Sequence, residues 1–480
     1  MLDATSGEGL TNAQIQVVGT TTGVLSGIDG RFTVTVPAGT VSILVRRIGY
    51  ASKTVTGLVV PAGGAVEASV ALSAATVQLQ TQTVTASAER GTVSSALAQQ
   101  KNATNVVNAI TSEQITRSPD ADAAAAVQRV SGVTVQDGKF VQVRGLGERY
   151  TTASLNGARL PSPEPERKVV PLDLFPSGLL QSVTTLKTFT PDQPGDFSGG
   201  QVDIRTREFP ARRQVTYSWS FGGNDGVTGA TLPVAPRAGG ERLAVTAADR
   251  EIPRVLDRTN FLTGSVPQSR FNEITRAQRN VWTPTIGRGL PSSSLAASVG
   301  GGTIFGRQIG YLLSGSYGFS AEARLNEANA VGNQGAANTV VPLTAVRGQT
   351  GRESVQWGGL ANFSTMLGRN TRVQLNNTFT RSADNEARTD RGFDENLSDT
   401  IARTTLRFVE RQLLSTNLQG EHQFGANNRT EWSGTFAATS RREPDRSDVV
   451  YVRGADGTFQ LLNSLDGARR LFFGLQEQNA

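Results

Sequence analysis

The sequence predicts a mainly β protein in three parts. These are a small β-sandwich, a compact α+β domain, and part of a large antiparallel sheet of the type that forms transmembrane β-barrels. Apolar and polar residues alternate with the period of a strand in many segments. The 52 glycines include Asn-Gly, Asp-Gly and Gly-Gly pairs, which favour turns between strands. Hydrophobic residues make up only 37% of the chain, which suits a barrel with polar inward-facing side chains.

Composition also narrows the function. The chain contains no Cys, which excludes disulfides and thiol metal sites. Its net charge is +6, from 47 basic and 41 acidic residues that are scattered, so we expect no nucleic-acid partner. No stretch of about 18 apolar residues is present, and the sequence therefore predicts no transmembrane helix. We identify no catalytic, metal-binding or cofactor-binding residues and expect a protein that is not an enzyme.

Residues 1–75 predict the β-sandwich. Apolar and polar residues alternate in four of its segments, residues 15–18, 31–36, 41–45 and 66–72. Asp29 and Gly30 supply turn residues between two of them. This part contains no His and no paired carboxylates, so we expect no catalysis from it.

Residues 76–101 predict an extended linker, because they are rich in Thr, Gln and Ala and have little apolar periodicity. Five linker residues favour a strand whose backbone groups remain free for a partner: Gln82, Thr83, Val84, Thr85 and Ala86. An ordinary connection between domains is the alternative interpretation.

Residues 102–209 predict the α+β domain. Residues 106–110 have a strand pattern, and Thr111 or Ser112 is suited to cap a short helix after them. Asp120 or Asp122 is suited to cap the Ala-rich helix that follows. Gly132 is expected to end that helix.

Two glycine motifs mark this domain. Arg144 and Gly145 follow an apolar strand, at a point where glycine lets two backbones approach closely. Gly199 and Gly200 open the last strand of the domain, which ends near Arg205.

A Pro-rich charged insert interrupts the domain at residues 161–168. We interpret this insert as a solvated loop, with a ligand contact as the alternative.

The ordered motifs of residues 102–209 resemble the plug domain of a TonB-dependent outer-membrane receptor. In that family the plug fills the lumen of a large membrane barrel. The series from Gly19 through Gly27 and Pro37 to Tyr50 is similar to the carboxypeptidase regulatory-like domain, a transthyretin-like sandwich often found ahead of such plugs. The two resemblances together cover about residues 1–210.

The resemblance has several implications. Residues 82–86 are similar to a TonB box, the segment that pairs as a strand with TonB, which the ExbB/ExbD complex energises. Arg144 and Arg205 are expected to pair with barrel carboxylates and hold the plug closed. The protein is expected in the outer membrane, in contact with its lipid, with the sandwich and linker in the periplasm. The expected ligand is a siderophore, glycan, cobalamin or peptide.

Residues 211–480 predict the barrel strands. In residues 214–221, Tyr217 and Trp219 share an apolar face, and the intervening residues are polar. The alternation recurs in four further segments, residues 308–319, 354–367, 371–381 and 432–438. We expect Tyr217, Trp219 and Trp357 to point away from the plug domain.

The connections between these strands are unequal in length. Residues 368–370 and 425–428 predict tight turns, whereas residues 381–403 predict a long charged loop. Short and long connections in turn are typical of bacterial outer-membrane barrels. The predicted loop carries five carboxylates, Asp384, Glu386, Asp390, Asp394 and Glu395. A calcium or ligand role for them is the alternative to an exposed loop.

The strand count suggests part of a larger protein. We count about eight strands in residues 211–480, whereas barrels with a plugged lumen have roughly 22. We therefore expect a fragment cut within the barrel. The chain begins without a signal-peptide pattern, so either the true N-terminus is missing or the gene start is set too late.

Two other motifs do not indicate a functional site. Gly145 and Gly147 begin like a dinucleotide loop, but Tyr150 stands where the third glycine belongs. His422 is the only histidine and lacks the partners of a triad or a zinc site. Two other functions remain open: an adhesion protein that binds through the sandwich and is anchored by the barrel, and a soluble glycan-binding β-protein.

Overall fold

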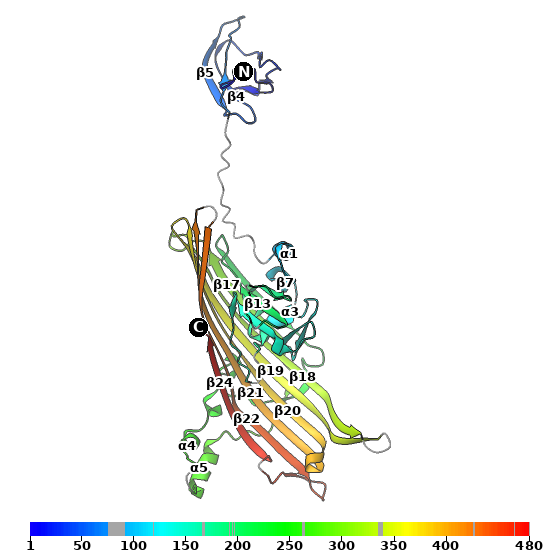
Figure 1. Cartoon of the computed structure of the whole chain (residues 1–480). Coiled ribbons are helices and arrows are strands. Elements are labelled where there is room, and N and C mark those ends of the chain that lie inside the picture. The colour runs from blue at the N-terminus through cyan, green and yellow to red at the C-terminus, as the bar shows by residue number, and fades with distance from the viewer. Residues whose placement is uncertain are drawn as a thin grey trace. The chain divides into compact units, whose positions relative to one another are not determined.

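The computed structural model describes residues 1–74, 92–118, 120–165, 169–191, 193, 195, 197–261, 265–334, 339–425, 428–464 and 466–479. The chain divides into two compact units, Met1–Thr85 and Ala86–Ala480, which are described separately (Figure 1). Residues 82–86, the predicted TonB-box segment, lie outside the described residues.

The N-terminal unit is a small β domain. Its main sheet has the order β3-β2-β4-β5, and β1 pairs in parallel with β6. The bounds are β1 Leu2–Asp3, β2 Gln14–Val17, β3 Gly23–Leu25, β4 Gly39–Arg46, β5 Lys53–Val60 and β6 Ala71–Leu72. Ile15 and Val45 lie opposite each other in β2 and β4 and are fully buried. The alternation therefore places one face of the sheet in the core.

One predicted strand of this unit is wrong. Residues 31–36 form no strand, although Phe32, Val34 and Val36 still pack against the core. The alternation correctly predicted that one side of this segment is partly buried. A segment can be buried in this way without pairing with a neighbouring strand. β5 pairs with β4 instead and was not predicted.

The α+β domain opens the second unit. Its five-stranded sheet has the order β11-β10-β13-β12-β7, with β10 and β13 parallel and the other pairs antiparallel. A separate hairpin pairs β8 with β9. The bounds are α1 Val93–Asn102, β7 Val107–Thr111, α2 Ser112–Thr116, α3 Ala123–Val127, β8 Val133–Gln136, β9 Phe140–Val143, η1 Glu148–Tyr150, β10 Thr151–Leu155, β11 Ala158–Arg159, η2 Leu172–Leu174, η3 Ser177–Leu179, β12 Leu180–Leu186 and β13 Gly200–Thr206.

The helix caps follow the sequence. Thr111 is the N-cap of α2, and its N–H donates to the side chain of Gln114 at 3.1 Å. Asp122 caps α3 by accepting the N–H of Ala125 at 2.9 Å. This helix is shorter than predicted, since it ends at Val127 and not at Gly132. Gly132 instead lies in the turn before β8, with φ 71°.

The large sheet has nine strands in the order β14-β17-β18-β19-β20-β21-β22-β23, with β24 also on β22. The bounds are β14 Gln214–Gly222, β17 Ser292–Gly301, β18 Ile309–Gln334, β19 Val340–Leu367, β20 Thr371–Asp394, β21 Asp399–Phe424, β22 Asn428–Arg453, β23 Phe459–Leu461 and β24 Ala468–Asn479. The sheet is antiparallel and does not close into a barrel within the described residues. The predicted mainly β architecture is confirmed.

One face of this sheet carries the predicted aromatic residues. Trp219 lies opposite Leu295, which lies opposite Tyr317, which lies opposite Trp357. Directly opposed residues share a face, so this row points to one side. Gln356 is on the other face and donates to the backbone oxygen of Asp173 in the α+β domain. The aromatic row therefore points away from that domain, as expected.

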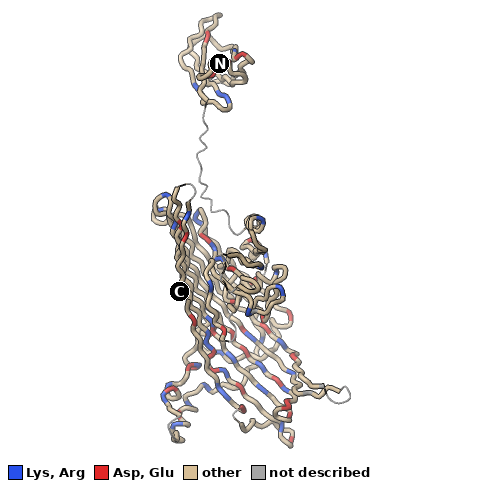
Figure 2. The backbone as a smooth tube through the Cα atoms, in the orientation of Figure 1, with Lys and Arg blue, Asp and Glu red and all other residues tan. Residues whose placement is uncertain are grey.

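The predicted charged loop at residues 381–403 is wrong. β20 continues to Asp394 and β21 begins at Asp399, with only the 3₁₀ helix η7, Glu395–Leu397, between them. Charged residues recur along both strands (Figure 2), and some pair with a neighbouring strand, as Glu386 of β20 does with Arg352 of β19 at 2.6 Å. The ion-pair partners lie in different strands, so the sequence pattern of a single segment does not identify them.

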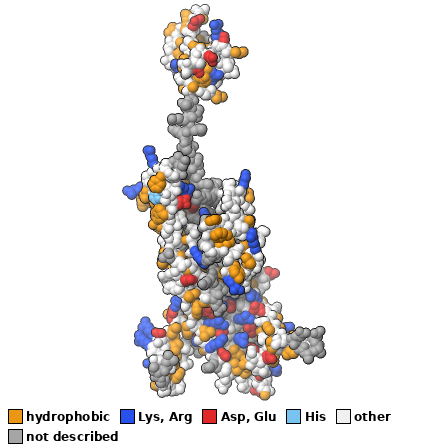
Figure 3. Space-filling view, viewed as in Figure 1, with side chains coloured by type: hydrophobic (Ala, Val, Ile, Leu, Met, Phe, Trp, Pro, Cys, Tyr) orange, Lys and Arg blue, Asp and Glu red, His pale blue; other side chains and the backbone are white. Residues whose placement is uncertain are grey.

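The long connection from β14 to β17 covers part of the outward face. It contains β15 Thr231–Val234, η4 Glu241–Leu243, η5 Ala248–Arg250, α4 Arg254–Asp257, α5 Gln268–Ala277 and β16 Thr285–Arg288. The Trp357 indole donates to the backbone oxygen of Leu243 at 2.8 Å, and Asn385 donates to that of Ala235 at 3.0 Å. Figure 3 shows basic side chains gathered over α4 and α5 at the lower left. These helices were not predicted.

No helix in the described ranges is long and apolar enough to cross a membrane.

Candidate functional site

Ion pairs join the α+β domain to the large sheet. Asp137 and Gly138 turn the β8–β9 hairpin with φ 55° and 68°, and Lys139 follows them. The Lys139 ammonium lies 2.7 Å from Asp384 in β20 and 3.0 Å from Asp173 in η2. Burial alone would lower the pKa of Lys139, but Asp173 and Asp384 outweigh it and raise that pKa, so Lys139 remains charged.

A carboxylate of the α+β domain forms the second connection. Glu164 accepts from Arg411 of β21 at 2.9 Å and also from Arg441 of β22. Arg411 in turn donates to Asp384 at 3.0 Å. These five side chains form one buried network, which we call the interface network: Lys139, Glu164, Asp384, Arg411 and Arg441. Buried charges are stable only when paired in this way.

The interface network corrects the interpretation of residues 161–168. Ser162 is buried, and its N–H donates to Glu477 of β24 at 2.9 Å. Glu164 is only 9% exposed. The described part of the insert, residues 161–165, is therefore docked on the sheet and is not a solvated loop.

A cavity of about 630 Å³, which we call the charged pocket, is lined in part by all five residues of the interface network. Asp137, Lys139 and Glu164 line it from the α+β domain. The inward face of the sheet contributes mainly arginines and carboxylates, and Leu471 and Phe473 add an apolar edge. The arrangement suits reversible binding of a charged ligand.

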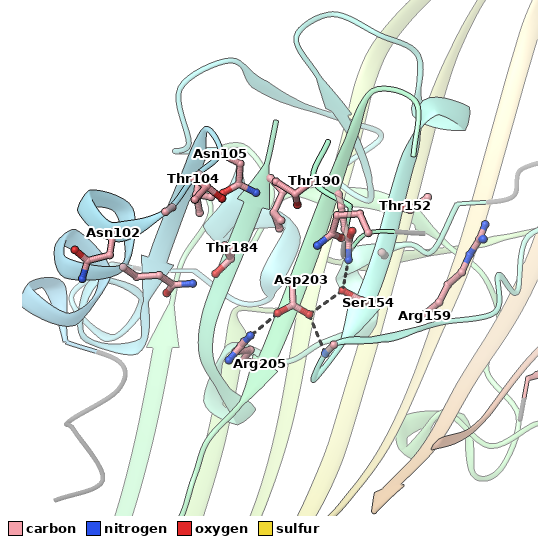
Figure 4. Close-up of a pocket in the computed structure, with 18 residues that line it drawn as sticks. Asn102, Thr104, Asn105, Thr152, Ser154, Arg159, Thr184, Thr190, Asp203 and Arg205 are labelled. Atoms are coloured by element: carbon pink, nitrogen blue, oxygen red, sulfur yellow. Dashed lines mark hydrogen bonds and ion pairs between the residues drawn. The ribbon is translucent and has the colours of Figure 1, made fainter. Parts of the chain in front are cut away.

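A second cavity of about 830 Å³ lies on the polar face of the domain's own sheet (Figure 4). Asp203 at its floor accepts from the Ser154 hydroxyl at 2.7 Å, from the N–H of Gly157 at 3.1 Å and from Arg205 at 3.0 Å. Buried oxygens of Thr184 and Gln201 have no hydrogen-bond partner in the part of the chain that the structure describes. This hydroxyl- and amide-lined surface suits water or an uncharged polar ligand.

The predicted arginines do not reach the sheet. Arg205 is half exposed and pairs with Asp203 of its own domain, because it projects into the second cavity. Arg144 is exposed and has φ 56°. Burial of Lys187 lowers the pKa of that residue, and the positive charge of Arg144 lowers it further. Their roles therefore remain predictions, and the observed ion pairs with the sheet come from Lys139 and Glu164.

The predicted glycines divide into two kinds. Gly145 has φ 74° and no atom within 4 Å of an added Cβ, so backbone conformation, not close approach, requires it. Close approach occurs at Gly199 and Gly200 instead. A Cβ on Gly199 would lie 2.9 Å from the Tyr150 oxygen, and one on Gly200 would lie 2.8 Å from Val143.

Gly200→Ala is expected to destabilise the domain by about 1–3 kcal/mol, because its methyl group would overlap the fully buried Val143. Gly147→Ala is the matched control, since its Cβ would meet nothing within 4 Å, and it should change stability by less than about 0.5 kcal/mol. Urea denaturation in detergent measures both. Equal midpoints for the two variants would contradict the packing account.

Asp122→Asn is expected to stabilise the domain more at pH 8 than at pH 4. Burial raises the pKa of Asp122 to about 7, against an opposing hydrogen bond from Ala125 and a further rise from Asp173. The folded state then binds more protons than the unfolded state between about pH 4 and 7, so stability falls as pH rises through that window. A rise in pKa of this size corresponds to about 4 kcal/mol.

Asn retains the helix cap, so capping should not obscure this result. Melting temperatures of the wild type and the variant at both pH values test it, and the same difference at pH 4 and pH 8 would contradict the expected titration.

No local sequence pattern predicts the interface network. Lys139 and Glu164 lie in a hairpin turn and a Pro-rich insert, about 245 residues or more from the strands that they contact. A usable signal was the alternation of Arg and acidic residues in residues 381–411, which marks a charged strand face. Among the described residues, no group of three His, Cys, Asp or Glu is placed to hold a metal ion.

The α+β domain is thus held by ion pairs against the polar face of a long antiparallel sheet. Residues 99–201 match the TonB-dependent receptor plug domain, and residues 2–73 match the carboxypeptidase regulatory-like domain. These matches confirm the prediction of a TonB-dependent receptor that carries both domains. No curated protein matches the chain.

Several solved structures are similar to the chain. A mutant ferric enterobactin receptor from Pseudomonas aeruginosa is 12% identical with a TM-score of 0.35, over 80% of this chain and 58% of that one. The RagAB peptide importer in the closed-closed state is 12% identical with a TM-score of 0.34, over 77% and 52%. The siderophore receptor PirA from Acinetobacter baumannii is 13% identical with a TM-score of 0.28, over 74% and 56%. The chain thus spans less than two thirds of each.

Proposed function

We propose that the chain serves TonB-energised uptake of a scarce ligand across the outer membrane, without covalent chemistry of its own. The observation that carries the proposal is the interface network, through which the plug domain rests on the polar face of the sheet. Apolar contact also contributes, because Leu413 and Ala437 of the sheet belong to the core of the plug domain. The aromatic outward face suits contact with membrane lipid.

The proposed parts are a periplasmic sandwich at residues 1–75, a linker at 76–101, the plug at 102–209 and barrel strands at 211–480. TonB, energised by ExbB and ExbD, would pull on residues 82–86. That Arg144 and Arg205 pair with barrel carboxylates and hold the plug closed stays a prediction. The ligand classes considered are siderophores, cobalamin, glycans and peptides.

Binding of the periplasmic domain of TonB to the full chain in detergent tests this function. Val84→Pro removes a backbone donor from the predicted TonB strand and should lower affinity at least about tenfold. Val77→Pro lies in the same linker outside that segment and should bind as the wild type does. If the wild type failed to bind TonB, or if both variants bound equally well, TonB coupling through residues 82–86 would be contradicted.

A further inference from the structure

The charged pocket contains more basic than acidic side chains. Seven Lys and Arg side chains and five Asp and Glu side chains line it, an excess of two positive charges (7 − 5 = 2). Glu164 is one of those five carboxylates. If Glu164 left its arginines, the excess would become three. Such an excess in a partly enclosed site favours an anion with several charges.

Two pocket arginines, Arg441 and Arg446, each have a buried Nε without a hydrogen-bond partner among the described residues, and Arg441 is the one of the two that contacts Glu164. Its side chain is 9% exposed and donates to Glu164 and, at 3.2 Å, to Glu443. Its buried Nε has no acceptor among the residues that the structure describes. A guanidinium offers five donors in a fixed fork that matches an oxyanion, so a ligand oxygen would satisfy this group.

Glu164 occupies the place that such an oxyanion would take. Its two carboxylate oxygens each accept from one arginine, Oε1 from Arg411 and Oε2 from Arg441. A ligand carboxylate or phosphate presents a similar pair of acceptors with at least the same negative charge. Exchange of one oxyanion for the other would keep both guanidinium groups paired and would release the Glu164 side chain.

We propose that the charged pocket binds a ligand with several oxyanion groups, and that this ligand displaces Glu164 from Arg411 and Arg441. The proposal rests on the proposed uptake function, since it makes ligand binding loosen one of the two connections that hold the plug. Lys139 and Asp384 stay paired during the exchange, so the plug remains on the sheet. Residues 160–165 become free to move and report that the pocket is occupied.

Hydrogen exchange of the full chain in detergent tests directly whether a ligand displaces Glu164 from its arginines. The probes are propane-1,2,3-tricarboxylate and pyrophosphate, each compared with potassium chloride at the same ionic strength. The reporters are the N–H groups of Ser162 and Glu164, which donate to Glu477 and to the Ser162 hydroxyl. We expect at least fivefold faster exchange of these two groups with one or both probes and no change with chloride.

Two variants separate displacement of the Glu164 side chain from other effects of the probes. Glu164→Gln weakens the connection, so exchange should be fast without a probe and should not rise further. Arg441→Lys keeps the charge but removes the fork, and should reduce the response to either probe at least threefold while the plug stays folded. A response to only one probe identifies a carboxylate or a phosphate ligand.

Unchanged or slower exchange in the wild type with both probes would overturn the proposal, as would an undiminished response in Arg441→Lys. TonB binding does not involve this pocket, so the two proposals fail separately. A chain that binds TonB but ignores both probes contradicts only the oxyanion exchange. A chain that responds to a probe but does not bind TonB contradicts only the uptake function.

Discussion

Arg411→Met is expected to lower the stability of the docked plug by about 3 kcal/mol, because a buried ion-pair network loses its central member. Arg411 is 7% exposed and donates to both Glu164 and Asp384. Without it, each carboxylate keeps one basic partner, Arg441 or Lys139. Met fills similar volume but supplies no donor, so the buried carboxylate oxygens that it faced would lose their partner.

The ion pair Arg117–Glu113 provides the matched control. It is an i,i+4 pair at the C-terminal end of α2, and Arg117 is 75% exposed. Arg117→Met should cost at most about 0.5 kcal/mol, since exposed pairs are screened by water. Hydrogen exchange of residues 107–206 at increasing urea measures both variants. Equal effects of the two substitutions would show that the interface network does not hold the plug.

Phe175→Ala is expected to destabilise the plug by about 3–5 kcal/mol, the cost of a large cavity in a packed core. Phe175 is 2% exposed, and its backbone oxygen accepts the N–H of Ala123 at the start of α3. The same core includes Leu413 and Ala437 of the large sheet. Collapse around the cavity should therefore also weaken the contact between plug and sheet.

Phe189→Ala is the control for aromatic loss without a cavity. Phe189 is 54% exposed and contacts the Phe197 ring at 5.9 Å. Its removal should cost less than about 1.5 kcal/mol. Urea midpoints for the plug and for the sheet, followed separately by hydrogen exchange, test both expectations. Loss of stability in the sheet alone after Phe175→Ala would contradict the core assignment.

Sequence reasoning identified the features that local patterns encode. Alternation at residues 214–221 correctly separated Tyr217 and Trp219 from the polar face, because a strand has a period of two. The turn at residues 368–370 follows from a glycine with φ 72° between two strands. The cap at Asp122 follows from the preference of helix N-termini for such side chains.

Features that depend on distant partners were missed or misread. Asp384 and Glu386 resemble loop residues until Lys139, Arg411 and Arg352 are placed beside them in space. Glu164 lies in a Pro-rich insert that appears solvated until the sheet buries it. Charged side chains carry no local signal of burial, because the energy that permits burial comes from partners elsewhere in the chain.

One face of the large sheet is proposed to meet lipid, and the other face holds the plug. Leu418 and Gln419 are neighbours in β21: Leu418 is 40% exposed, and Gln419 donates to the backbone oxygen of Asn156 in the plug at 3.4 Å. The chain has no native Cys, so Leu418→Cys and Gln419→Cys each carry a single fluorophore. In brominated-lipid bilayers, we predict strong quenching at position 418 and little at 419. Equal quenching at both positions, or stronger quenching at 419, would contradict this assignment of the two faces.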